Sequence, residues 1–181
     1  MSVKASHIYT FGGFDHVEKC QLKSCEVYSI DKDRWHNNDE IQLHEARSQS
    51  SASLFDDNVI YIFGGYNKEG GTLASIERYD IGRKRIIKLE LHIPIPLRRF
   101  ASIKISNSKI ILLGGISRLN KDSDTVFCFD IEQSSDGGKI KYSIENLDKL
   151  DKTGACDYPI TLDSVGSLHL FFENNSGTSP P

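Results

Sequence analysis

The sequence predicts an all-β protein built from repeated four-stranded antiparallel sheets. Three apolar runs of strand length each end in a glycine pair, at Gly12-Gly13, Gly64-Gly65 and Gly114-Gly115. The first glycines of these pairs stand 52 and 50 residues apart. A period of about 50 residues indicates a stacked or radial repeat in which each unit is one supersecondary block. No stretch of the chain has a helical period of apolar residues.

The first unit begins with a strand at 7–11, which the glycine pair ends because glycine adopts φ > 0 and lets neighbouring backbones approach. A polar loop over 15–23 follows. Residues 25–30 alternate with strand period, 31–33 form a turn, and 34–36 start a short returning strand. Residues 41–45 then connect to the next unit.

The second and third units each add one strand at the front. Strands are predicted at 51–55, 59–63, 76–81 and 85–91, and again at 100–105, 109–113, 125–131 and 139–144. A fourth unit begins with strands at 155–162 and 168–172, and the polar tail 174–181 is expected to be disordered. The units are therefore about 7–46, 47–97, 98–154 and 155–173, within one segment over 1–173. Repeated four-stranded sheets marked by glycines are typical of propeller blades.

At this point the residues resemble the kelch repeat: an apolar strand, a glycine pair, an aromatic, a tryptophan, and an arginine that leads into the next blade. The aromatics match Tyr28, Tyr79 and Phe129, at intervals of 51 and 50 residues. Trp35 matches the tryptophan, whereas Ile86 departs from the pattern at the same offset. The arginines match Arg47 and Arg98, 17 and 16 residues before their glycine pairs. Phe172-Glu173 replaces the glycine pair in the degenerate fourth unit.

The resemblance implies a kelch-type β-propeller segment of about three to three and a half four-stranded blades. Kelch propellers close into rings of more blades, and closure removes exposed sheet edges. This segment is therefore not expected to close by itself. A fragment, a truncated gene model and an oligomerising half-propeller all remain open, so the missing blades come from a longer chain or from self-association. Trp35 and Tyr79 are expected to be largely buried, because aromatics contribute most of the buried area in thin sheets.

Composition argues against several classes of function. The net charge of −3 predicts no binding of nucleic acid, and no apolar run approaches the roughly 18 residues that span a bilayer. Six scattered histidines predict no metal site, and no cofactor is expected. The four cysteines form no CxxC pair and are interpreted as reduced structural thiols, and the chain is expected to be cytoplasmic. No catalytic constellation is recognisable.

Two classes of function remain. Kelch relatives often serve as substrate-recognition parts of ubiquitin ligases or as scaffolds, which implies a non-enzymatic module that binds partner proteins through loops at one end of the blades. The resemblance assigns this role to Arg47, Arg98, Arg99, Asp15, Tyr66, Asn67, Ser117 and Arg118. The alternative for the arginines is that they only bridge blades by hydrogen-bonding to turn carbonyls. The alternative function is a fragment of a kelch-like propeller enzyme, of the copper oxidase or sugar epimerase type.

Overall fold

The computed structural model describes residues 6–132, 140–150, 160–162 and 168–170. The predicted tail 174–181 and the Phe172-Glu173 site lie outside these ranges, as does Cys156. All regular structure within the described ranges is β-strand. These ranges hold no helix with the length and apolar character that crossing a membrane would require.

Three antiparallel sheets follow one another along the chain and correspond to the first three predicted units. The first sheet has the order β1-β4-β5, formed by His7–Phe11, Ser24–Ser29 and Arg34–Gln42. The second has the order β11-β10-β7-β6, formed by Arg85–His92, Ser75–Asp80, Val59–Phe63 and Ser51–Asp56. The third has the order β13-β14-β16-β17, formed by Ala101–Lys104, Lys109–Leu113, Val126–Glu132 and Lys141–Asn146. Strand β18 (Ile160–Leu162) pairs with β19 (Leu168–Leu170) as the fourth-unit hairpin.

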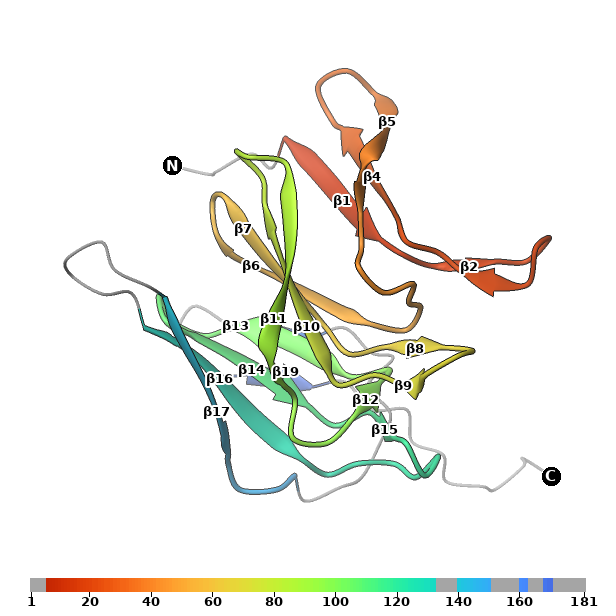
Figure 1. Cartoon of the computed structure of the whole chain (residues 1–181). Helices are drawn as coiled ribbons and strands as arrows, with labels where there is room; N and C mark the ends of the chain where they lie inside the picture. Colours follow the sequence, from red (N-terminus) through yellow and green to blue (C-terminus); the bar gives the residue numbers. More distant parts are fainter. Residues whose placement is uncertain (1–5, 133–139, 151–159, 163–167, 171–181) are drawn as a thin grey trace, which may run out of the picture.

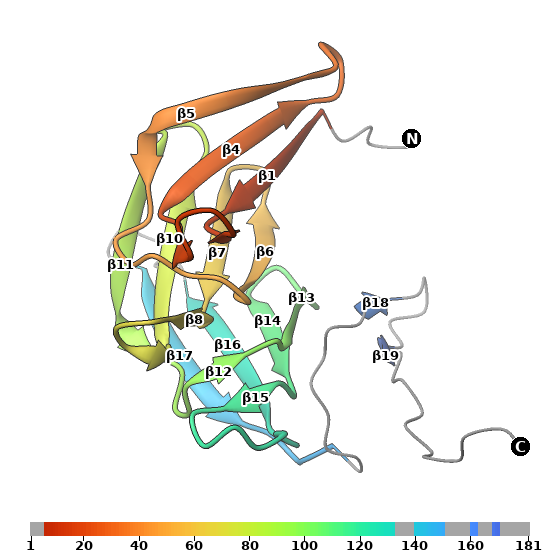
Figure 2. The ribbon, with the colours of Figure 1, turned by 90° about the vertical axis from the view of Figure 1, so that its right-hand side faces the viewer.

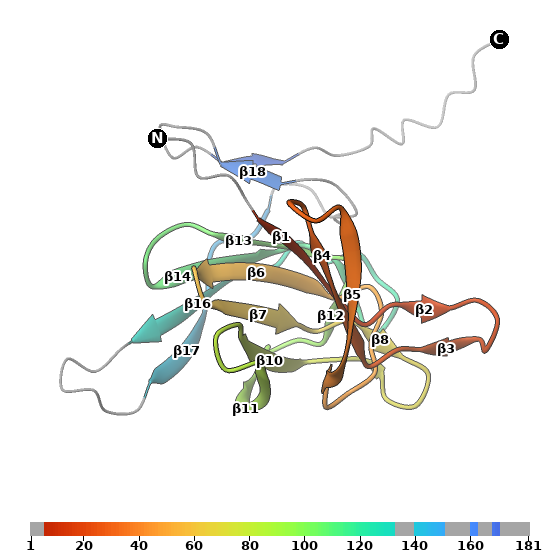
Figure 3. The ribbon, with the colours of Figure 1, turned by 90° about the horizontal axis from the view of Figure 1, so that it is seen from above.

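The sheets stack like consecutive blades and leave the ring open (Figures 1 and 2). Strands β1, β6 and β13 lie on one side and β5, β11 and β17 on the other (Figures 2 and 3). Ser51 Oγ and Ser53 Oγ each lie 2.8 Å from Ser102 Oγ and so join the inner strands β6 and β13. Among the described strands none pairs with the inner edge of β1, as expected for a first blade that lacks its innermost strand.

The core lies between the sheets rather than within one of them. One cluster fills the space between the second and third sheets and includes Tyr61, Phe63 and Phe129. Another fills the space between the first and second sheets and includes Tyr79, which packs against Phe11 and is 2% exposed. Tyr79 and Phe129, which occupy equivalent positions in their sheets, therefore both face the preceding sheet. The predicted burial of Tyr79 is confirmed.

The predicted burial of Trp35 is wrong, because its side chain is 53% exposed. Trp35 pairs with Tyr28 across β4 and β5, as Ile86 pairs with Tyr79 in the next sheet. Ile86 and Tyr79 pack against the first sheet. Trp35 and Tyr28 occupy the corresponding face of the first sheet, and no described sheet lies against that face. Their rings instead contact each other, with centroids 5.2 Å apart.

Two connectors join successive blades: residues 43–50 form the first and residues 93–100 form the second. The glycine pairs allow each connector to cross directly over the end of a strand of the preceding blade. Gly13 N donates to Arg47 O at 2.9 Å, and Gly65 N donates to Leu97 O at 2.9 Å. Gly65 has φ +105°, and a Cβ there would lie 2.7 Å from Ser48 O. A side chain at this position would therefore push the connector off the sheet.

Candidate protein-binding surface

Short hairpins occur in the polar segments that follow the glycine pairs, where the sequence predicted only loops. In the first unit β2 (Phe14–Asp15) pairs with β3 (Cys20–Gln21), and in the second β8 (Tyr66–Asn67) pairs with β9 (Gly71–Thr72). In the third, β15 (Ile116–Ser117) pairs with β12 (Leu97–Arg98) of the connector. All three lie on the same side of the molecule (Figure 1). We call residues 14–21, 66–72 and 116–122 the loop surface.

Each loop is shaped by one polar side chain at the position after the first strand residue. Asp15 Oδ1 accepts hydrogen bonds from Val17 N at 2.7 Å and Glu18 N at 3.0 Å. These two bonds, with the one from Glu18 the larger effect, hold the pKa of Asp15 below its ordinary value. Asn67 Oδ1 accepts from Gly70 N, and Ser117 Oγ donates to Lys121 O at 3.1 Å. Asp15, Asn67 and Ser117 therefore build the loops that present their neighbours.

The loops of successive blades are joined by hydrogen bonds. Lys68 N donates to Gln21 Oε1 at 3.0 Å, which links the first two loops. Arg118 Nη2 donates to Gly70 O at 3.1 Å, which links the second and third. The loop surface is therefore one continuous surface rather than three independent tips.

Arg98 lies at the base of this surface and is half-buried. Its guanidinium donates to Gln49 Oε1 at 2.7 Å and to Asn120 Oδ1 at 2.9 Å. It also lies over the Tyr66 ring, 5.7 Å from the centroid. Arg99 beside it is exposed, with φ +54°. The structure thus brings Tyr66, Arg98 and Arg118 to one side of the molecule.

Two of the loop tips carry exposed apolar side chains that sequence reasoning missed. Val17 is 85% exposed and Leu119 is 77% exposed. Counted from the glycine pairs, both occupy the same position of their loops, where the second loop has Glu69. Phe14, which is 41% exposed, precedes Val17 in the same loop and packs edge-on against His16. An aliphatic residue at the tip of an otherwise polar loop was the available signal in the sequence.

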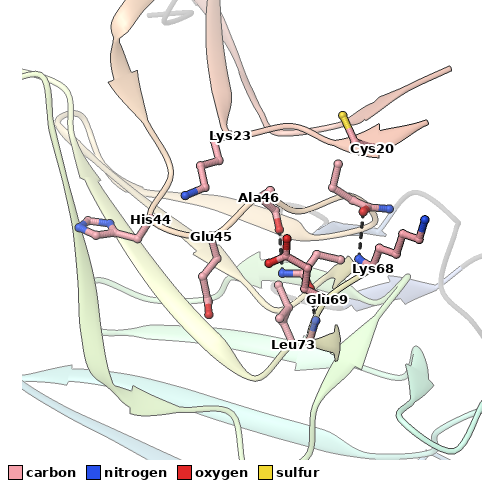
Figure 4. Close-up of a pocket in the computed structure, with 11 residues that line it drawn as sticks. Cys20, Lys23, His44, Glu45, Ala46, Lys68, Glu69 and Leu73 are labelled. Carbon is pink, nitrogen blue, oxygen red and sulfur yellow. Dashed lines mark hydrogen bonds between the residues drawn. The ribbon is translucent and has the colours of Figure 1, made fainter. Parts of the chain in front are cut away.

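A pocket of about 600 Å³ opens between the first two loops (Figure 4). Figure 4 shows His44 at one end of the labelled side chains and Lys68 at the other, with Glu45 between them. Its walls combine both charges, one exposed thiol and a short apolar stretch, and consist of Cys20, Gln21, Lys23, His44, Glu45, Ala46, Asn67, Lys68, Glu69, Gly70 and Leu73. Asn67 Nδ2 donates to Ala46 O at 3.1 Å and holds the second loop against the connector.

Arg47 does not belong to the loop surface, and its assignment to a partner-binding role is corrected. Its side chain is 0% exposed. Its guanidinium donates to Gly64 O at 2.8 Å, Ser75 Oγ at 3.1 Å and Glu77 Oε1 at 2.6 Å. Glu77 is also fully buried. Arg47 therefore anchors the first connector to the second sheet, as the bridging alternative describes.

Glu77 completes this anchor from the other side. Its carboxylate accepts from His44 N at 2.8 Å and Glu45 N at 3.2 Å, and His44 Nδ1 lies 3.1 Å from Oε2. Glu45 in turn accepts from Ser75 Oγ and pairs with Lys88 Nζ at 3.0 Å. The buried side-chain nitrogen and oxygen atoms of Arg47, Ser75 and Glu77 therefore all have hydrogen-bond partners.

Backbone hydrogen bonds align the two connectors one residue away from the sequence match, which paired Arg47 with Arg98. Because Gly13 N donates to Arg47 O and Gly65 N donates to Leu97 O, Leu97 is the structural counterpart of Arg47. Arg98 corresponds to Ser48, since Ser48 bridges Tyr66 as Arg98 pairs with Ile116. Leu97 packs in the core cluster that contains Phe127, the counterpart of Glu77. An ion pair in one connector is thus replaced by an apolar pair in the next.

The other reactive groups of the described residues are not assembled into a site. No three side chains among histidine, cysteine, aspartate and glutamate gather as metal ligands within the described part of the chain. Burial raises the pKa of the Cys25 thiol to about 12, and it also raises the pKa of Cys128. Both thiols are therefore protonated at neutral pH, whereas Cys20 is exposed at the rim of the 600 Å³ pocket.

Known proteins match most of the chain. The family model described as "KLHDC2/KLHL20/DRC7 Kelch-repeats domain" matches residues 1–156. Beta-scruin of Limulus polyphemus is 27% identical over 135 residues, which cover 68% of this chain and 14% of the relative. Alpha-scruin of the same organism is 29% identical over 134 residues, which cover 69% of this chain and 14% of the relative. The matched region is therefore a small part of both relatives.

Proposed function

This chain belongs to the kelch-repeat family, and from that premise we propose that it is a non-enzymatic protein-interaction module whose loop surface binds a partner protein. The observation that carries the proposal is the pair of exposed aliphatic tips, Val17 and Leu119, held on loops that are hydrogen-bonded to one another. Loops on a rigid sheet framework are where binding residues concentrate.

The construction of the loops favours binding because less freedom is lost on association. Asp15, Asn67 and Ser117 fix the loop backbones, and the contacts of Gln21 and Arg118 fix the loops relative to one another. Ordering an interface costs about 0.5–1.5 kcal/mol for each immobilised side chain. A surface that is already ordered avoids much of that cost.

Charged groups around the tips would orient the bound partner. Arg98, Arg99 and Arg118 remain the proposed contacts for carboxylates of the partner, because a planar guanidinium grips a carboxylate with two hydrogen bonds. Tyr66 supports Arg98 from beneath through the ring contact. In this proposal the aliphatic tips provide apolar contact area, and the arginines set the orientation of the partner.

Lysine footprinting of the chain with its captured partner tests which side binds. Lys19, Lys68 and Lys121 lie on the loop surface, and all three are exposed. We expect the partner to protect them from acetylation, while Lys32 and Lys84, at the turns on the other side, stay reactive. Mass spectrometry of tryptic peptides reads both sets in one sample. Protection of the second set alone would refute the loop surface as the binding site.

Replacing Val17 and Leu119 by serine provides the matched mutational test. Burying an aliphatic side chain contributes about 1.5–3 kcal/mol, so each change should weaken partner binding about tenfold or more, measured by titration calorimetry. Thermal stability should not change, because both tips contact little of the protein. Ile105→Ser is the control, since Ile105 is 40% exposed at the β13–β14 turn on the other side. Equal effects of tip and control variants would contradict the proposal.

A further inference from the structure

A second pocket, of about 300 Å³, opens between the first and second sheets where β1 begins and β10 turns into β11. These two segments lie beside each other in Figure 1. The pocket is lined by His7, Tyr9, Val27, His36, Tyr79, Ile81 and Lys84. It is separate from the loop surface, and its volume is at the lower end of the range for small-ligand sites.

The repeat supplies an internal comparison for this pocket. Tyr9 pairs with Val27 and Val27 with His36, as Tyr61 pairs with Arg78 and Arg78 with Ile87. By this register His36 corresponds to Ile87, and His7 corresponds to Val59. Both counterparts belong to or pack against the core cluster between the second and third sheets. In the interface between the second and third sheets, apolar side chains therefore stand in place of the two histidines, and Arg78 stands in place of Val27.

The floor and the rim of the pocket differ in chemistry. Tyr9, Tyr79, Val27 and Ile81 form an apolar and aromatic floor, and Tyr79 is almost fully buried. His7, His36 and Lys84 supply three nitrogen-bearing side chains. None of the described lining residues is acidic, so the rim carries positive charge without a carboxylate among the residues that line it.

Two carboxylates of these turns, Asp80 and Asp33, form contacts away from the pocket. Asp80 accepts from Arg83 N at 2.9 Å and pairs with Arg83 Nη1 at 3.3 Å. Asp33 accepts from the Tyr28 hydroxyl on the other face of the first sheet. His36 accepts from Arg34 Nε at 3.4 Å. Its pKa lies below the ordinary value because of desolvation first, and then because of the charges of Arg34, Lys32 and His7. The surroundings of His36 therefore favour an added negative charge.

We propose that this pocket binds a small organic anion, with an aromatic or branched aliphatic body on the Tyr9–Tyr79 floor and an anionic head held by His7, His36 and Lys84. A ligand with an apolar body and a charged head would use both the aromatic floor and the positively charged rim of the pocket. In the next interface the positions of His7 and His36 are taken by Val59 and Ile87, which contribute to the core instead of a charged rim. The geometry fits a carboxylate, sulfonate or phosphate equally, since all three accept hydrogen bonds from imidazole and ammonium groups.

Titration with benzenesulfonate, followed by NMR of the 181-residue chain, tests the pocket. The sulfonate stays ionised at every pH used, so only protein groups titrate. We expect shifts confined to residues that line the pocket, with affinity at least tenfold higher than for inorganic sulfate or for neutral benzamide. If inorganic sulfate binds equally well, the aromatic floor contributes nothing and the proposed site for an organic anion is wrong. Equal binding of benzamide would remove the role of the head group.

The pH dependence follows from the position of His36. A bound anion stabilises protonated His36 and raises its pKa, so binding takes up a proton. Affinity should therefore rise as pH falls from the higher pKa of His36 in the complex towards the pKa of free His36, which lies below the usual value of about 6.5. We expect about fivefold tighter binding at pH 5.5 than at pH 7.5. A pH-independent affinity would contradict the assignment of His36.

Variants separate the head-group contacts from folding. Lys84→Gln, on an exposed turn, should weaken benzenesulfonate binding about fivefold or more without changing the spectrum elsewhere. His36→Ile copies Ile87 and should fill the pocket, abolish binding and preserve the fold. Arg85→Gln is the control, because Arg85 is exposed next to Lys84 and does not line the pocket. Binding that survives both pocket variants, or that the control removes equally, would overturn the proposal.

Discussion

Replacing Arg47 by leucine should lower the free energy of unfolding by about 3–5 kcal/mol, the cost of breaking a buried ion pair by removing one partner. The change leaves Glu77 buried at 0% exposure without its 2.6 Å guanidinium contact. It also removes the donor to Gly64 O, which ties the connector to the second sheet. Urea unfolding followed by intrinsic fluorescence measures the loss, which is large relative to the 5–15 kcal/mol typical of a domain.

The next connector supplies the matched rescue. Leu97 and Phe127 stand where Arg47 and Glu77 stand, and both are buried. The double variant Arg47→Leu/Glu77→Phe should therefore recover part of the loss, because an apolar pair can replace a buried ion pair. Recovery is incomplete because His44 N and Glu45 N lose their acceptor. In the second connector Pro94 stands at the position of His44 and has no N–H to satisfy.

Arg98→Ala is the control for this experiment. Arg98 donates to exposed groups, Gln49 of the first connector and Asn120 of the loop surface, so its removal should cost about 1 kcal/mol or less. If the Arg47 and Arg98 variants lose equal stability, the two arginines are equivalent after all. If the double variant is less stable than Arg47→Leu alone, a leucine–phenylalanine pair cannot replace the Arg47–Glu77 ion pair in the first connector.

Sequence periodicity predicted the sheets because the apolar strand that ends at a glycine pair recurs once in each of the first three units. It could not align the connectors. Arg47 and Arg98 match as residue types, but backbone hydrogen bonds align Arg47 with Leu97. One position of slip exchanges a buried side chain for a half-buried one, since neighbouring residues of an extended chain face opposite ways. The burial of Arg47 depends on Glu77, which is 30 residues away and carries no local signal.

The loops show a second limit of sequence reasoning. The hairpins β2–β3 and β8–β9 are two residues per strand, too short for an alternating pattern to reveal. Their order comes from Asp15 and Asn67, which the resemblance assigned to partner binding and whose side chains shape the loop backbones in the structure. The contacts that join one loop to the next cross about 47 residues of sequence, as between Gln21 and Lys68. Such contacts depend on how the blades stack.

The error at Trp35 leads to the second large prediction, on Phe129. The Phe129 side chain is 0% exposed, with its ring 5.2 Å from that of Tyr61 and 5.3 Å from that of Phe63. It lies between two sheets that do not share strands, so the space left by alanine cannot be filled by one sheet alone. Phe129→Ala should therefore cost about 3–5 kcal/mol, measured by urea unfolding.

Trp35→Ala is the contrast, because Trp35 belongs to the face of the first sheet that corresponds to the face Phe129 occupies. The change removes the contact with the Tyr28 ring, and an aromatic pair contributes about 0.5–1.5 kcal/mol. The loss should therefore be about 1 kcal/mol, at low and high protein concentration alike. A loss near that of Phe129→Ala that grows with protein concentration would instead mean that a second copy covers Trp35 in solution. In that case the tryptophan would be buried by association rather than by the fold of one chain.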